Sequence, residues 1–222
     1  PKYAVLDPNL TIGLPKSITA TTGMDALTHA VEAYIGNSNT KETIELSEMA
    51  IKLIFDNIKT AFDDGENITA RENMLLASHY AGLAFTRAYV GYVHAIAHTL
   101  GGFYNIPHGH ANAVILPYVL DYFGSSVYEK LSDLTKIINV FDSSKSSEEN
   151  AKEFISQIRK LNNYLEISNK IQGIDDKDIP LMINRALSEA NPLYPVPMIL
   201  GERDLRVLYM QIMGKAQDNT VN

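Results

Sequence analysis

Residues 91–110 read GYVHAIAHTLGGFYNIPHGH and hold four of the six histidines in the chain. His94 and His98 are four residues apart, so a helix would place them on one face, one turn above each other. We expect Gly101–Gly102 to end or bend this helix. In the loop that follows, Gly109 would let another backbone segment approach closely. Histidines crowded in this way predict a metal site or a proton relay.

A second stretch, residues 21–34, reads TTGMDALTHAVEAY and is predicted to be a helix. Asp25 and His29 are again four residues apart and share a face with small or apolar residues. A carboxylate and an imidazole on such a face would be costly to bury without partners. A cation shared with the histidines of residues 91–110 would remove that cost.

The candidate metal ligands are therefore Asp25, His29, His94 and His108, with His98 and His110 as near alternatives. One carboxylate and three neutral imidazoles would leave a divalent cation with a net charge of about +1, so it would stay electrophilic. Nitrogen and oxygen ligands without sulfur suit Fe²⁺, Zn²⁺, Mn²⁺, Co²⁺ or Ni²⁺. His79 has no such partner nearby in the sequence, so we interpret it as an ordinary packed residue.

The composition excludes several classes of protein. The 222 residues carry a formal net charge of -7 and show no basic run, which argues against a nucleic-acid or anionic-membrane surface. The absence of cysteine excludes disulfides and thiolate chemistry and fits a reducing cytoplasm, where we expect the protein to reside. No apolar run reaches the roughly 18 to 20 residues that a membrane helix needs.

The spacing of apolar residues predicts an all-α fold, a multi-helix bundle without strand–turn–strand signals. Residues 1–16 are expected to be an extended or strand-like lead-in, and Thr69 with Glu72 is expected to form a capping box. Pro117 should kink one helix. Besides the helix of the first histidine pair, the predicted helices cover residues 23–35, 41–63, 70–87, 112–122, 126–140, 147–162, 176–190 and 203–213.

Four parts of the sequence resemble the iron-containing (group III) alcohol dehydrogenase family. They are Leu6–Asp7–Pro8, residues 22–34, the histidine pattern of residues 91–109, and Asn112–Ala113 followed by Leu116–Pro117. The resemblance is strong over residues 1 to about 122 and weak beyond. It implies the fold of the C-terminal domain of the dehydroquinate synthase-like and iron-containing alcohol dehydrogenase proteins.

The resemblance also implies roles for single residues. Asp25, His29, His94 and His108 match the family's metal ligands, with Fe²⁺ as the expected ion and Zn²⁺ as a possible one. His98 matches a position near the nicotinamide, where it would shape the cofactor site or relay a proton. Phe85 matches a position near the substrate, which would be a small alcohol or aldehyde. His110 lies where members of the family vary.

The family implies a further, Rossmann-like half that binds NAD or NADP through a glycine-rich loop. We find no such loop and no alternating strand–helix pattern, and the chain opens at Pro1 without methionine. We therefore expect residues 1–222 to be one helical metal-binding domain, a C-terminal fragment that is inactive alone. The full-length protein is expected to be a homodimer or a higher homo-oligomer.

Two other functions stay open at this level. A metal-dependent lyase of the dehydroquinate synthase type would share the architecture and also use NAD, but it would regenerate its cofactor within each turnover. A non-catalytic helical module, used for metal binding or oligomerisation, would expose the apolar surface on which a nucleotide-binding half should dock. The sequence does not separate iron from zinc, NAD from NADP, or one alcohol from another.

Overall fold

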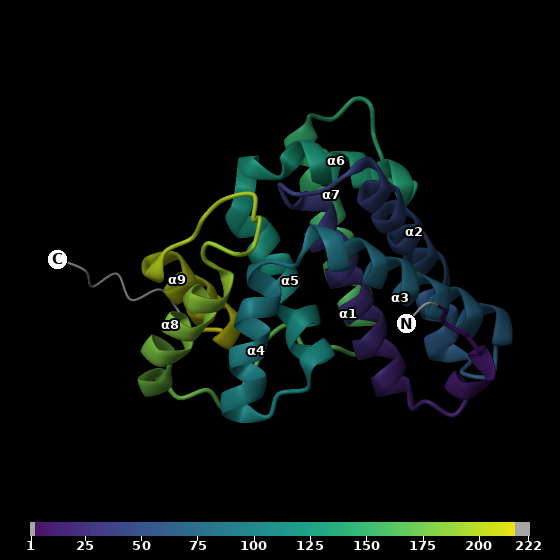
Figure 1. The fold of residues 1–222 in the computed structure, drawn as a ribbon, viewed down its shortest axis with the longest axis horizontal. Coiled ribbons are helices and arrows are strands. Elements are labelled where there is room, and N and C mark those ends of the chain that lie inside the picture. The colour runs from purple at the N-terminus through teal and green to yellow at the C-terminus, as the bar shows by residue number, and fades with distance from the viewer. Residues whose placement is uncertain (1–2, 216–222) are drawn as a thin grey trace.

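The computed structural model describes residues 3–215, which form helices joined by short connections (Figure 1). No strand occurs within this range, which confirms the predicted all-α fold. That residues 1–222 are one domain stays a prediction. The α-helices are α1 (Lys16–Ile35), α2 (Lys41–Asp63), α3 (Ile68–Ala88), α4 (Tyr92–Tyr104), α5 (His108–Phe123), α6 (Tyr128–Ile137), α7 (Ser147–Tyr164), α8 (Ile179–Ala190) and α9 (Glu202–Met213). Short 3₁₀ helices lie at Pro8–Thr11, Gly124–Ser126 and Asp176–Asp178.

Side-chain caps fix the starts of several helices. Thr40 and Thr43 form a reciprocal capping box at α2, and Ser146 and Glu149 form one at α7. In each box, two backbone N–H groups that the helix itself cannot satisfy find side-chain acceptors. These two helices are amphipathic, so the same local sequence that starts them also turns their apolar face toward the core.

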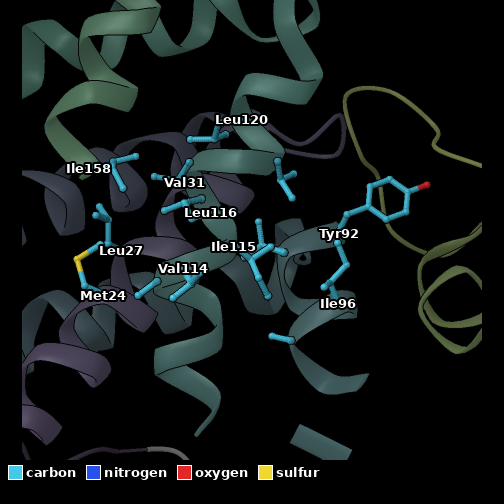
Figure 2. Packing of buried hydrophobic residues seen from close by; sticks show 14 of the residues in the cluster. Met24, Leu27, Val31, Tyr92, Ile96, Val114, Ile115, Leu116, Leu120 and Ile158 are labelled. Carbon is cyan, nitrogen blue, oxygen red and sulfur yellow. The ribbon is translucent and has the colours of Figure 1, made fainter. Parts of the chain in front are cut away.

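Helix α1 is the central element of the fold. It packs against α2, α3 and α5, and Met24, Leu27 and Val31 on it are completely buried. Figure 2 shows these side chains facing apolar side chains of α5, with Ile158 of α7 beside them. Complete burial of one such side chain stabilises the fold by about 1.5–3 kcal/mol. The polar residues of α1 are therefore held in a rigid apolar setting.

Helices α4 and α5 complete the surroundings of the predicted site. Helix α5 packs against α1 on one side and α4 on the other, and α4 in turn packs against α8 (Figure 1). Asn105, in the left-handed conformation, separates α4 from the start of α5 and ends α4. The middle of α1, the start of α4 and the start of α5 thereby meet.

Several local predictions differ from the structure. Helix α1 begins at Lys16 rather than near residue 23, and α6 ends at Ile137 rather than near residue 140. The lead-in is not strand-like throughout, because Pro8–Thr11 forms a 3₁₀ helix capped by Asp7. Helix α3 begins at Ile68 and is capped by Asn67, whose side chain accepts the Ala70 N–H, so Thr69 is not the cap. Helix α4 continues through the Gly101–Gly102 pair to Tyr104. Helix α5 begins at His108 rather than near residue 112, because Pro107 precedes its first turn.

Within residues 3–215, no helix combines the length and the apolar character required to cross a lipid bilayer.

Candidate metal centre

Three helices bring the four predicted ligands together. Asp25 and His29 lie one turn apart on α1, His94 lies in the first turn of α4, and His108 is the first residue of α5. One possible ligand atom from each residue falls into a group in which all atoms lie within 4.8 Å of one another. The His108 Nε2 and His94 Nε2 atoms lie 3.4 and 3.9 Å from the Asp25 carboxylate. His98 and His110, the near alternatives, fall outside this group.

The group is buried on one side and open on the other. The His94 side chain is 3% exposed, whereas the His108 side chain is 43% exposed. Burial, followed by the neighbouring His94, lowers the pKa of His29 to about 4, and burial also lowers the pKa of His108. These two imidazoles are therefore neutral near pH 7, the form in which histidine binds metals. The exposed edge at His108 leaves room for a further ligand.

Asn112 shows that the group has an excess of acceptors. Its side-chain nitrogen donates to Asp25 Oδ1 at 2.5 Å and also lies 3.0 Å from His108 Nε2 and 3.2 Å from His94 Nε2. An amide nitrogen has two hydrogens for these three acceptors. Its own oxygen, Oδ1, is buried without a hydrogen-bond partner among the described residues. The nitrogen and oxygen atoms of the group thus have more lone pairs than there are hydrogens to share. A divalent cation bound by these atoms would supply the missing positive charge.

His98 lies one turn beyond His94 and faces a different neighbour. Its Nδ1 atom is 2.7 Å from Glu189 Oε1, and the Tyr194 hydroxyl donates to the same oxygen. The His98 ring stacks on that of His108 with centroids 5.2 Å apart. It also lines an open cavity of about 760 Å³ between α4 and α8. His98 therefore connects the ligand group to this cavity.

Phe85 of α3 packs against the ligand group at His29. Its ring stacks on the His29 ring, with centroids 4.3 Å apart and an interplanar angle of 18°. His29 in turn stacks on His94 at 4.3 Å. The predicted substrate-side residue thus contacts a predicted ligand directly. His79, nearly two turns earlier on α3, lies outside the ligand group.

Sequence reasoning missed the roles of Glu32 and Asn112. Glu32 follows His29 by three residues, and its carboxylate contacts His94. Asn112 follows His108 by four residues on α5. Each is a polar residue in an otherwise apolar helical stretch, and each lies one turn from a predicted ligand. That spacing was the available signal, because a buried polar residue requires a partner.

Comparison with known proteins places the chain in a known family. The chain belongs to the Fe-containing alcohol dehydrogenase family, and residues 19–213 match the C-terminal part of that family. This agrees with the resemblance of the two histidine-bearing stretches.

Individual relatives are similar over nearly the whole chain. The 1,3-propanediol dehydrogenase of Klebsiella pneumoniae is 40% identical over 213 residues, which cover 95% of this chain and 55% of that protein. Alcohol dehydrogenase 4 of Saccharomyces cerevisiae is 38% identical, covering 86% of this chain and 49% of that protein. A crystal structure of 1,3-propanediol oxidoreductase superposes with a TM-score of 0.89 at 39% identity, covering 93% of this chain and 55% of that one. The chain thus spans about half the length of these relatives.

Proposed function

We propose that this chain is the metal-binding half of a metal-dependent alcohol dehydrogenase or aldehyde reductase. The observation that carries the proposal is the acceptor-rich group of one carboxylate and three imidazoles, supported by membership in the iron-containing family. Asp25, His29, His94 and His108 would hold the ion. Fe²⁺ is the first choice, because of the family, and Zn²⁺ accepts the same ligand atoms.

A divalent cation bound there would supply Lewis-acid chemistry toward the oxygen of an alcohol or aldehyde. The residues of the chain determine how a substrate could approach. The buried side, at His94, excludes water, and the exposed edge, at His108, admits a small molecule. His98, hydrogen-bonded to Glu189, would pass the hydroxyl proton toward the open cavity. Phe85 would line the substrate side next to His29.

The described residues do not form a complete binding site for a nucleotide cofactor. Residues 3–215 contain no strand and therefore no strand–loop–helix phosphate site. NAD or NADP would belong to a part of the full-length protein outside this chain. A structure of sulfoacetaldehyde reductase from Bifidobacterium kashiwanohense, 25% identical with a TM-score of 0.81, was obtained in complex with NAD+. The homo-oligomeric state of the full-length protein stays a prediction.

The names of the relatives favour a dehydrogenase over a lyase of the dehydroquinate synthase type. The Klebsiella pneumoniae relative is a propanediol dehydrogenase, and the Saccharomyces cerevisiae relative is an alcohol dehydrogenase. The non-catalytic alternative gains no specific support, because Phe85 and His98 flank the ligand group as a reaction site would require.

Elemental analysis of the anaerobically purified chain tests the metal site. We expect about one iron or zinc per chain, lost in His94→Ala and retained in His79→Ala, a histidine outside the ligand group. Equal metal content in the two variants would contradict the ligand assignment. Metal absent from the unchanged chain would count against the proposed metal site.

A further inference from the structure

Glu32 is the most deeply buried carboxylate beside the candidate metal centre. It lies on α1, and its side chain is 3% exposed. Its Oε2 atom is 2.6 Å from Nδ1 of His94, and its Oε1 atom accepts the backbone N–H of Val93 at 2.8 Å. Both partners lie in the first turn of α4. One carboxylate therefore contacts both the ligand imidazole and the backbone of the helix that carries it.

The start of α4 has both the space and a free backbone N–H group for this carboxylate. The residue that precedes the helix is Gly91, which provides no side-chain cap. A Cβ atom at Gly91 would lie 2.8 Å from Glu32 Oε1, so a larger residue would displace the carboxylate. Glu32 thus satisfies a free N–H at the helix N-terminus, where the helix dipole also favours negative charge.

The contact with Nδ1 determines which nitrogen of His94 carries the proton. A carboxylate only accepts hydrogen bonds, so Nδ1 must hold a hydrogen, and in the neutral imidazole that can bind a metal Nε2 then keeps its lone pair. Nε2 is the atom that faces the ligand group, 3.9 Å from Asp25 Oδ1. The Asn112 amide nitrogen donates toward Nε2 at 3.2 Å, which agrees with Nε2 as an acceptor.

We propose that Glu32 is a positioning residue of the metal centre, which fixes the orientation and the tautomer of His94 so that Nε2 is free to bind the cation. This inference rests on the proposed metal site and adds the carboxylate partner of its most buried ligand. With Asp25, Glu32 supplies two negative charges, which balance a divalent cation in a buried setting. A carboxylate behind a metal-bound imidazole raises the basicity of the ligand and holds its ring in place.

The decisive variant is Glu32→Gln, which keeps the size of the side chain. The glutamine oxygen can still accept the Val93 N–H, but its NH₂ group then faces Nδ1 of His94. That nitrogen must become the acceptor, and the proton moves to Nε2, the atom needed by the metal. Glu45→Gln on α2, where the side chain is 59% exposed, is the matched control.

We expect Glu32→Gln to lower the Zn²⁺ affinity of the chain about 10- to 100-fold in a chelator competition, and Glu45→Gln to leave it unchanged. Gly91→Ala should lower it as well, because its Cβ displaces the carboxylate. In the metal-free chain, ¹⁵N NMR of the histidine rings should show His94 protonated on Nδ1. In Glu32→Gln it should show the proton on Nε2.

The outcomes separate this inference from the metal site itself. Equal Zn²⁺ affinity in the unchanged chain and in a folded Glu32→Gln would overturn the role of Glu32 and leave the metal site standing. An unchanged chain that binds no Zn²⁺ would count against the proposed function. The NMR comparison needs no metal, and a proton on Nε2 of His94 in the unchanged chain would overturn the inference by itself.

Discussion

Gly109, in the first turn of α5, lies directly against the backbone carbonyl of Thr21 on α1: a Cβ atom at Gly109 would sit 2.3 Å from that oxygen. The same contact brings His108 within 3.4 Å of Asp25. The backbones of the two helices therefore approach as closely as a glycine allows, and this approach helps to set the geometry of the ligand group.

Gly109→Ala should force α1 and α5 apart. We expect a loss of about 1–3 kcal/mol in the free energy of unfolding, as for other overpacked sites, together with weaker metal retention. Thermal unfolding and elemental analysis measure the two effects. Gly82→Ala in α3, where a Cβ would meet nothing within 4 Å, is the control and should be neutral or stabilising by up to about 1 kcal/mol. Indistinguishable behaviour of the two variants would show that the Gly109 contact is unimportant.

Asn112→Ala should destabilise the metal-free chain more than the metal-loaded chain. Without metal, the Asn112 amide is the donor for Asp25, and its loss should cost about 1–3 kcal/mol. A bound cation would satisfy the same acceptors, so the cost should shrink. Thermal unfolding with EDTA and with saturating Zn²⁺ tests this. The control is Asn162→Ala, which removes a buried hydrogen bond to Ala113 on α5 and should lower the stability equally with and without metal. An equal loss of stability in the two conditions for Asn112→Ala would contradict the proposed link between Asn112 and the metal.

Phe85→Ala should weaken substrate binding without removing the metal. The ring lies against His29 on the proposed substrate side, and the loss of one apolar contact with a small substrate costs about 1 kcal/mol, or roughly fivefold in KM. The test is steady-state kinetics of an active full-length enzyme that contains this chain, with metal content measured in parallel. Leu83→Ala, an exposed residue of the same helix, is the control. A loss of metal with unchanged KM would assign Phe85 to the support of His29 instead.

His98→Phe should lower kcat and keep the metal. If His98 moves the hydroxyl proton, its loss should cost about 10²- to 10⁴-fold in kcat, the usual range for a general acid or base. The ligand group does not include His98, so one ion per chain should remain. The measurement is kcat together with metal content, and His79→Phe is the control. An unchanged kcat would remove His98 from the reaction.

The capping box of α7 makes a pH-dependent contribution to stability. The backbone N–H and the hydroxyl of Ser146 hold the pKa of Glu149 below its ordinary value of 4.5. Near this pH the unfolded chain binds more protons than the folded one, so the contribution is complete above pH 4.5 and is lost as the pH falls through the lower folded-state pKa. Ser146→Ala should raise the pKa of Glu149 and lower the Tm at about pH 7. The Tm difference should shrink in acid; a constant difference would contradict the linkage.

Local sequence signals predicted the helices well where a cap or an apolar stripe was strong. Helix α2 was predicted with its observed bounds, and the capping box at Ser146 marks the start of α7. The errors lie at helix ends where several neighbouring residues could act as the cap. Asn67 rather than Thr69 caps α3, and Asn105 rather than the Gly101–Gly102 pair ends α4. The choice between neighbouring caps depends on the loop that precedes or follows the helix, which propensity alone does not describe.

The sequence by itself determined that Asp25 and His29 share a helix face, as do His94 and His98, because helix periodicity is a local property. Only the tertiary structure shows which neighbours the two members of the second pair meet. His94 faces α1 and meets Asp25, whereas His98, one turn farther along α4, meets Glu189 of α8. Distances between helices depend on how whole apolar faces pack, so they are not encoded in the spacing of a few residues. The same packing buried Glu32 against His94 and gave the centre a partner that sequence reasoning had missed.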